Sequence, residues 1–122
     1  MRKDGATLGI DVGTSAVKVV AVGGDGRVLA RASRPYPMTS SAPGFVEQDP
    51  EHWWRGTLAA LREIVAAIGA ERIEGIGLSG QLNGVVLLDG DNRVLRPAII
   101  WLDTRGAAMA SELAARHGTL LR

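Results

Sequence analysis

The amino-acid sequence predicts an α/β fold built on a mixed sheet, and two observations support this. Short runs of apolar and β-branched residues occupy the first third of the chain and recur after residue 72, and two segments with helical spacing of apolar residues lie among them. The 122 residues can bury one hydrophobic core and are too few for two ordinary domains. We therefore expect residues 1–122 to form a single domain, in the order strand, strand, strand, helix, strand, hairpin, strand, helix.

The first third of the chain predicts a meander of three antiparallel strands. Residues 7–11 and 16–22 are apolar runs, and residues 27–34 alternate between small apolar and polar side chains. Such alternation with a period of two is typical of a strand with one solvent-exposed face. Glycines and an aspartate at 23–26 predict the hairpin turn between the second and third strands.

The clearest helix start follows a loop at 35–44 that is rich in proline and serine. Asp49 can accept a hydrogen bond from a first-turn amide, Pro50 suits the first helical position, and Gly69 predicts the end of the helix. Apolar residues recur between them at intervals of three and four: Trp54, Leu58, Leu61, Val65 and Ile68. We expect this face to be buried, with Trp54 in the core and the adjacent Trp53 at an interface or covering a loop.

The remainder of the chain predicts two more strands and a second hairpin. Residues 73–78 and 98–101 are apolar runs, and the turn-forming residues 89–92 separate two short segments at 85–88 and 93–95.

A last helix is expected over residues 105–117. Asp103 or Thr104 can cap it, and Met109 and Leu113 are expected to face inward.

Composition and charge exclude several classes of protein. The chain has no cysteine, which excludes a disulfide scaffold and a cysteine-based zinc site. Its 14 basic and 13 acidic residues give a net charge of +1, so no basic surface for nucleic acid is expected. No apolar run is long enough to cross a membrane, and no signal peptide is recognisable. We expect a cytoplasmic protein with no nucleic-acid or membrane partner.

The turn after the first strand has the residue types of a phosphate and metal site. Asp11 ends the strand, and the small residues Gly13, Thr14 and Ser15 follow it. A carboxylate beside amides and hydroxyls can hold hydrated Mg²⁺ and the terminal phosphates of a nucleotide, and Lys18 can approach the same charge. The alternative is an ordinary hairpin in which Asp11 accepts hydrogen bonds from the turn amides.

Residues 75–80 match the dinucleotide-binding pattern G-x-G-x-x-G, which would indicate an oxidoreductase. That site requires a helix to begin at its last glycine, whereas a strand-forming run follows here. We reject the dinucleotide site and expect the glycines to allow close packing of a strand against neighbouring backbone.

A second group of polar residues consists of Gln81, Asn83, Trp101, Asp103 and Arg105. If the strands at 76–79 and 98–101 are neighbours, these residues lie at one edge of the sheet, where open α/β sheets bind ligands. Amides, a carboxylate and a guanidinium suit hydroxyl groups, and an indole packs against the C–H groups of a sugar. The alternative is a capped helix with solvated first-turn residues.

Four segments, taken in order, resemble the FGGY carbohydrate kinases. Residues 8–18 resemble the opening strand-turn-strand of that family, and residues 44–54 resemble its first helix and the approach to it. Residues 77–84 are similar to the sugar-site loop, and residues 96–105 to the strand that follows. Within the family the chain is most similar to xylulokinases.

This resemblance implies an actin-like, ribonuclease-H-like fold that transfers the γ-phosphoryl group of ATP to a hydroxyl group of a sugar. By position, it implies that Asp11 organises Mg²⁺. The other residues that it places in the site approach the phosphates (Gly13, Thr14 and Ser15) or the sugar (Leu82, Asn83, Trp101 and Asp103). Xylulokinases usually carry Met-His where this chain has Leu82 and Asn83, a departure at the sugar loop. The expected substrate is therefore a class, a ketopentose such as xylulose or a related polyol, and not xylulose alone.

Length is the second departure from the family. Family enzymes are roughly four times as long, and the resemblance places their catalytic base and adenine-covering domain beyond residue 122. We therefore expect an incomplete N-terminal domain that is inactive in isolation. The alternative function is a non-catalytic binding or assembly module that associates with itself through an exposed sheet face.

Overall fold

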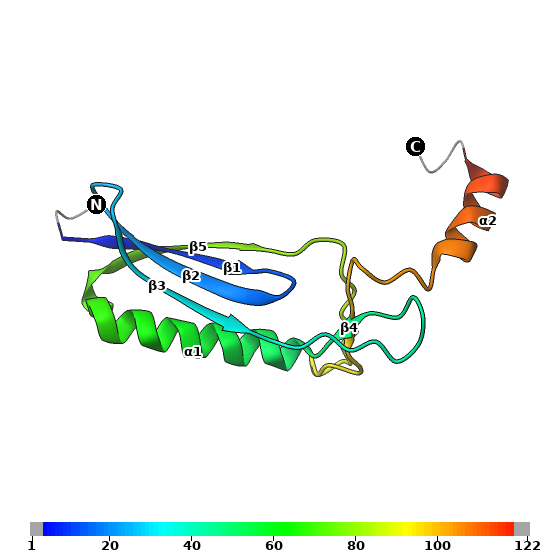
Figure 1. Ribbon diagram of the computed structural model, residues 1–122, viewed down its shortest axis with the longest axis horizontal. Helices are drawn as coiled ribbons and strands as arrows, with labels where there is room; N and C mark the ends of the chain where they lie inside the picture. The colour runs from blue at the N-terminus through cyan, green and yellow to red at the C-terminus, as the bar shows by residue number, and fades with distance from the viewer. Residues whose placement is uncertain (1–3, 119–122) are drawn as a thin grey trace.

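The computed structural model describes residues 4–118 and contains a four-stranded sheet with one long helix against it (Figure 1). The strand order is β3-β2-β1-β5, formed by β3 (Val28–Pro35), β2 (Ala16–Gly23), β1 (Ala6–Val12) and β5 (Ile73–Gly80). The first three strands pair antiparallel, whereas β5 pairs parallel to β1. The predicted meander and the mixed α/β sheet are confirmed.

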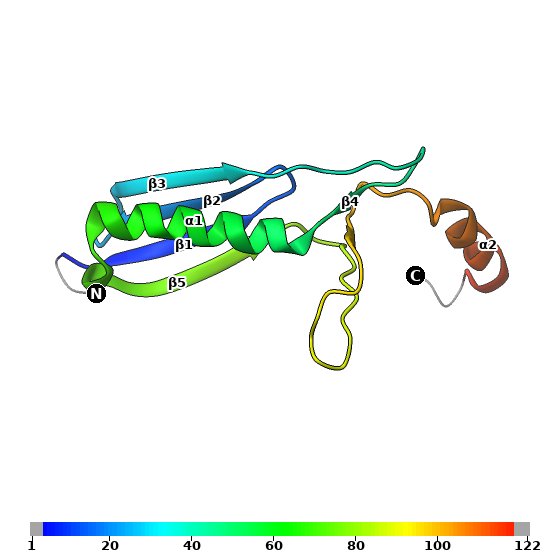
Figure 2. The ribbon, with the colours of Figure 1, turned by 90° about the horizontal axis from the view of Figure 1, so that it is seen from below.

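Helix α1 (Pro50–Ile68) covers one face of this sheet, mainly over β2 and β3 (Figure 2). Alternate residues of the strands point at the helix, as the period of a strand requires. The core between the two layers consists of Ala6, Leu8, Ile10, Val17, Val19, Ala21, Ala32, Tyr36, Ala60, Ile64 and Ile68.

The ends of α1 are as the sequence predicts. The Asp49 carboxylate accepts a 2.9 Å hydrogen bond from the Glu51 amide, and Gly69 ends the helix with a positive φ of 85°. A short 3₁₀ helix, η1 (Ala70–Arg72), then leads into β5. Glycine adopts this φ without the steric cost that a side chain would add.

The buried face of α1 differs from the predicted one. Trp54 is 58% exposed, so its predicted place in the core is wrong, and Trp53 packs against the core instead. The helix meets the sheet through small residues, Gly56 and the fully buried Ala60, because a Cβ at position 56 would lie 3.3 Å from a methyl group of Val17. A buried face predicted from the large apolar residues alone does not include these small residues, which make the closest contact with the sheet.

A second, two-stranded sheet lies beyond the strand ends. It consists of β4 (Glu47–Gln48) and β6 (Ala98–Ile99), which pair antiparallel. The strands around 76–79 and 98–101 are therefore not neighbours, and the condition on which the sequence placed the second polar group at one sheet edge is not met. The backbone of Ile99 exchanges hydrogen bonds with Val85 as well, so its polar groups are satisfied outside the main sheet and β5 remains an edge strand.

The segment between β5 and β6 projects away from the main sheet (Figure 2). Its hairpin is confirmed at the turn, where the Asp89 carboxylate accepts from the amides of Asp91 and Arg93 and Asn92 has a φ of 62°. Its two arms are joined by one bridge, between Leu88 and Val94, and by backbone hydrogen bonds from Leu95 to Leu87 and from Asp89 to Arg93.

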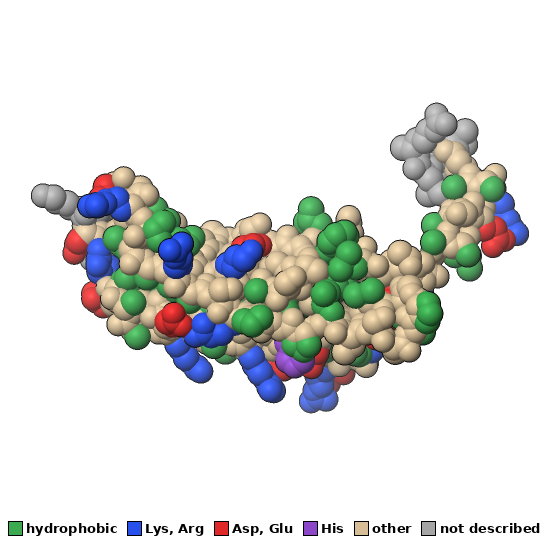
Figure 3. Space-filling view, in the orientation of Figure 1, with side chains coloured by type: hydrophobic (Ala, Val, Ile, Leu, Met, Phe, Trp, Pro, Cys, Tyr) green, Lys and Arg blue, Asp and Glu red, His purple; other side chains and the backbone are tan. Residues whose placement is uncertain are grey.

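Helix α2 (Ala107–His117) stands apart from the sheet and buries none of its residues (Figure 1). The predicted inward positions of Met109 and Leu113 are wrong, since both side chains are exposed. Figure 3 shows hydrophobic side chains on the outer surface of this helix. The predicted cap is also wrong, because Gly106 precedes the helix and no side chain caps it. The carboxylate of Asp103 is engaged by other groups, which are described below. Within residues 4–118, no helix is both long and apolar enough to span a membrane.

Candidate functional site

The turn between β1 and β2 brings a carboxylate against a tight backbone. The Gly13 amide donates to the Ala16 carbonyl at 3.1 Å, and the Tyr36 hydroxyl donates to the Gly13 carbonyl. A Cβ at position 13 would lie 3.2 Å from the Ala16 carbonyl oxygen and 3.5 Å from Oδ2 of Asp11. Glycine thus lets the carboxylate lie against the turn. Burial and the nearby charge of Asp11 raise the pKa of Tyr36, so its hydroxyl remains a donor.

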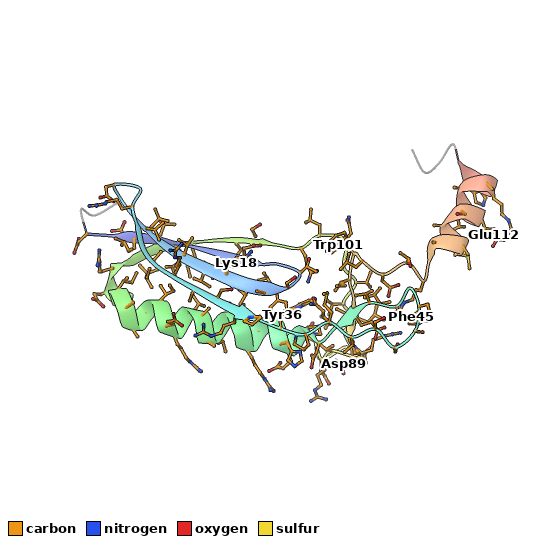
Figure 4. All side chains as sticks on the ribbon, in the orientation of Figure 1. Lys18, Tyr36, Phe45, Asp89, Trp101 and Glu112 are labelled. Carbon is orange, nitrogen blue, oxygen red and sulfur yellow. The ribbon has the colours of Figure 1, made fainter. Side chains whose placement is uncertain are left out.

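Asp11 shares the open face of the sheet with two residues of the neighbouring strands. It pairs with Lys18 of β2 and with Ser79 of β5. These three residues line an open trough of about 990 Å³ on the face opposite α1, and Figure 4 shows Lys18 on the sheet. In the part of the chain described, neither an ion pair nor a turn amide engages the Asp11 carboxylate, so the ordinary hairpin with Asp11 bound to turn amides is not what forms.

The donor set at this turn fits a hydrated Mg²⁺. Residues 4–118 contain no cluster of three or more acidic or histidine side chains that could enclose a metal ion. Mg²⁺ does not require such a cluster, because it keeps several waters and binds through one or two carboxylates together with substrate phosphates. Asp11 is such a carboxylate, and it lines the open trough, where phosphates and water can reach it.

The loop after β5 forms a separate pocket at the carboxyl ends of β1 and β5. The Gln81 amide donates to the Val12 carbonyl at 2.9 Å, which extends the parallel pairing by one residue. Asn83 has a φ of 57° and turns the chain, while Leu82 is exposed. The pocket has a volume of about 350 Å³ and is lined by Val12, Trp53, Gly80, Gln81, Leu82, Asn83, Gly84 and Val86.

One buried side chain joins the turn to this loop. Gln48 of β4, with 1% of its surface exposed, donates from Nε2 to the Thr14 carbonyl at 2.7 Å. Its Oε1 accepts from Nε2 of Gln81 at 2.9 Å and from Nε1 of Trp53 at 3.0 Å. Trp101 adds a second contact, because its Nε1 donates to Oγ1 of Thr14 at 2.8 Å. The structure therefore brings Thr14, Gln81 and Trp101 together.

Asp103 occupies a charged cluster beside Trp101. Its side chain is 2% exposed and accepts from the Val46 amide at 2.7 Å and from the Arg105 guanidinium. The Arg105 hydrogen bond holds the pKa of Asp103 far below its usual range, and Asp103 in turn raises the pKa of Arg105.

The same guanidinium extends the cluster to Glu47 and Phe45. It bonds Oε1 of Glu47 at 2.7 Å and lies 3.9 Å from the centre of the Phe45 ring. Hydrogen bonds from Arg105 and then Arg96 lower the pKa of Glu47 against the effect of desolvation. The cluster ties residues 45–47 to residues 96–105, at the end of the sheet where Figure 4 labels Phe45 and Trp101.

A family model for the N-terminal domain of the FGGY family of carbohydrate kinases matches residues 6–120. The chain belongs to this family. It is 44% identical over 113 residues to the xylulose kinase of Bacillus subtilis (strain 168), which covers 91% of this chain and 23% of that protein. The xylulose kinase of Escherichia coli (strain K12) is 39% identical over 109 residues, or 89% of this chain and 22% of that protein.

Solved structures agree with this assignment. A kinase from Brucella ovis, described as a xyloylose kinase, superposes with a TM-score of 0.84 at 39% identity, over 91% of this chain and 24% of that one. The xylulose kinase of Rhodospirillum rubrum gives a TM-score of 0.84 at 36% identity, over 91% and 23%. The predicted actin-like fold of sugar kinases is thereby confirmed. The present chain spans about a quarter of the length of these relatives.

Two residues of this FGGY chain were not among the predicted site residues. Gln48 and Tyr36 both bond the backbone of the β1–β2 turn. Gln48 has a signal in the sequence, because it is a neutral polar residue just before the Asp49 cap with no capping role of its own. Tyr36 lies in a loop, and nothing in its sequence neighbours indicates its partner.

Proposed function

We propose that this FGGY chain supplies the phosphate turn and the sugar loop of an ATP-dependent kinase, whose substrate is a ketopentose such as xylulose or a related polyol. The observation that carries the proposal is the shared partner Gln48, because Thr14 of the turn and Gln81 of the loop both bond its amide. Donor and acceptor substrates would thus meet at the carboxyl ends of β1 and β5. The names of the relatives support xylulose as the first sugar to test. The cytoplasm, where ATP is available, is the expected site of action.

The turn would orient the phosphates. Asp11 would hold Mg²⁺ through its carboxylate and through waters, and the ion supplies neutralisation of the phosphate charge when bound. Amides and hydroxyls of Gly13, Thr14 and Ser15 would bond phosphate oxygens. Lys18 pairs with Asp11 across the two strands and would place a positive charge on the same face. Phosphoryl transfer depends mainly on such positioning and charge stabilisation, so few reactive groups are required.

The loop and β6 would hold the sugar. Trp101 is 53% exposed, and its indole would pack against C–H groups while its Nε1 remains on Thr14. Gln81 and Asn83 supply amides for hydroxyl groups, and Leu82 supplies an apolar wall. Asp103 is engaged by Arg105 and Val46, so its contribution to the pocket would be to fix the position of Trp101 two residues earlier.

A hybrid enzyme tests this function. Residues 6–118 replace the matching segment of the Bacillus subtilis xylulose kinase, and ADP release is followed with ATP, Mg²⁺ and a panel of ketopentoses and polyols. We expect turnover with at least one sugar, and a loss of about 100-fold or more in kcat for Asp11→Asn, the scale for removing one electrostatic group from a transition state. Asp25→Asn, in the exposed β2–β3 turn, is the matched control. A hybrid that folds and phosphorylates no sugar would refute the proposal.

The 122-residue chain alone is expected to give no turnover above a blank. Its described residues supply one wall of the site, since both Trp101 and Leu82 are largely exposed. Water would therefore reach the reactants freely, and no opposing group would align them. Turnover by the pure chain with ATP and sugar would contradict this.

A second candidate function is that of an assembly module, and the edge strand β5 favours it. Leu78 is 77% exposed and Ile76 is exposed as well, on the α1 side of the sheet, because α1 lies mainly over β2 and β3. An apolar edge strand associates readily with a second copy. Light scattering of the chain should show species larger than a monomer, and Leu78→Glu should restore the monomer. A clean monomer without dye-detectable apolar surface would exclude this function.

A further inference from the structure

The hydrogen bonds of Gln48 have directions that its neighbours impose. The indole nitrogen of Trp53 can only donate, and the carbonyl oxygen of Thr14 can only accept. The Gln48 amide must therefore direct its oxygen to Trp53 and its nitrogen to Thr14. The structure agrees, with Nε1 of Trp53 3.0 Å from Oε1 of Gln48 and Nε2 of Gln48 2.7 Å from the Thr14 carbonyl oxygen. Exchange of the two amide atoms, which ordinary density cannot distinguish, would break both bonds.

This direction passes on to Gln81. Because Oε1 of Gln48 is an acceptor, Gln81 must present its NH₂ group, at 2.9 Å. Oε1 of Gln81 is left buried and without a hydrogen-bond partner among the described residues. An unpaired buried acceptor is unfavourable. The hydrogen bond to Gln48, and not any interaction of Gln81 Oε1, therefore sets the orientation of the Gln81 amide.

The backbone that carries Gln48 is fixed independently of both segments. Gln48 pairs with Ala98 in the β4–β6 sheet, and the preceding Glu47 forms ion pairs with Arg96 and Arg105. A side chain anchored in this way can set the position of flexible neighbours. Gln48 is also almost fully buried, with 1% of its surface exposed.

We propose that Gln48 is a positioning residue, which sets the phosphate turn and the sugar loop in one fixed relation through a single amide. This inference rests on the proposed function, because it assigns the two segments to the two substrates. Loss of the amide would free Thr14 and Gln81 together, although they are far apart in the sequence.

Nuclear magnetic resonance of the isotope-labelled 122-residue chain tests the imposed directions. Trp53 and Gln81 both donate to Oε1 of Gln48, so their hydrogens lie within about 4 Å of each other, given the usual hydrogen-to-oxygen distance of about 2 Å. We expect a nuclear Overhauser effect between the Trp53 indole proton and the side-chain NH₂ of Gln81. The exposed Trp54 indole should show none and should exchange at least tenfold faster. Absence of the Trp53 effect in the folded chain would overturn the proposal.

Two variants distinguish positioning from space filling. Gln48→Glu can still accept from Trp53 and Gln81, but it donates to the Thr14 carbonyl only when the carboxyl is protonated. We expect the Thr14 carbonyl resonance of this variant to titrate, with a midpoint above the ordinary glutamate range because burial disfavours the charge. Gln48→Leu fills similar space and should show the shifted Thr14 resonance at every pH. No titration in Gln48→Glu would count against positioning.

Kinetics of the hybrid enzyme separate this proposal from the function on which it rests. Gln48→Leu should raise the KM for ATP and the KM for the sugar at least fivefold each, whereas Trp54→Phe should change neither. A rise in only one KM would overturn the joint role. If the hybrid without these substitutions is inactive, the proposed function fails, and the Overhauser effect and the titration still decide whether Gln48 sets both segments.

Discussion

The bond between Trp101 and Thr14 allows the sharpest test of how this site is assembled. It joins the segment after β6 to the turn after β1, with Nε1 of Trp101 donating to Oγ1 of Thr14 at 2.8 Å across 87 residues of sequence. Trp101→Phe removes the donor and keeps the ring. Thr14→Val removes the acceptor and keeps the shape of the side chain.

The expected size of this interaction follows from its surroundings. Neutral hydrogen bonds contribute about 0.5–1.5 kcal/mol net, because water competes for both partners. Trp101 is 53% exposed, so water reaches this site, and we expect about 1 kcal/mol in the coupling term. That energy corresponds to roughly a fivefold change in an equilibrium constant.

A double-mutant cycle measures the coupling without the side effects of either substitution. The free energy of unfolding in urea is obtained for the 122-residue chain, both single variants and the double variant. The control cycle pairs Thr14→Val with Trp54→Phe, which share no contact and should be additive. A coupling below about 0.3 kcal/mol, the usual error of additivity, would refute the claim that this bond holds the turn to β6.

Three further substitutions separate the core, the charged cluster and the turn. Ile64→Ala should lower the free energy of unfolding by about 2–5 kcal/mol, because Ile64 is fully buried. Leu113→Ala, on the exposed helix α2, should lower it by less than about 0.5 kcal/mol. Equal urea midpoints for the two variants would contradict the assigned core. Asp103 has its pKa lowered in the folded chain, so its contribution is present above the unfolded pKa of about 3.9 and is lost as the pH falls towards the folded value. Asp103→Asn should therefore flatten the acid side of the stability profile, and an unchanged profile would argue against the ion pair. Gly13→Ala should raise the KM for ATP in the hybrid enzyme by roughly tenfold, or about 1.4 kcal/mol, through crowding of the turn, while Gly90→Ala, whose Cβ would meet no atom within 4 Å, should leave it unchanged.

The fold was predictable wherever one local pattern decides the structure. Alternation in residues 27–34 predicts a strand, and Asp49 predicts a helix start, each from a few neighbouring residues. Both predictions are confirmed. The buried face of α1 was not, because its position depends on how closely Gly56 approaches Val17 on another element. Helical spacing identifies a stripe, but it does not show that small residues allow the closest contact.

The sequence proposed residues for the candidate site but did not predict how they are connected. Thr14, Gln81 and Trp101 were among the proposed residues, and the structure brings these three together. The pairing of β6 could not be predicted, because a two-residue strand carries too little pattern to choose between β5 and β4. Gln48 was missed for a related reason, since a polar residue acquires its importance from burial and partners that adjoin it only in the folded chain.

The trough and the pocket lie at successive residues of the same two strands, so which residues line each of them depends on the strand register. Asp11 and Ser79 line the trough, whereas the next residues, Val12 and Gly80, line the pocket. Side chains alternate between faces, so a slip of one residue would exchange the two sets. Gly80 opposes such a slip, because a Cβ at its place would lie 3.1 Å from the Val12 carbonyl oxygen, and Ser79 moved into that place would carry one. The glycine that resembles part of a nucleotide fingerprint thus favours the observed register, which keeps Asp11 on the open face of the sheet and Val12 on the face packed against the core.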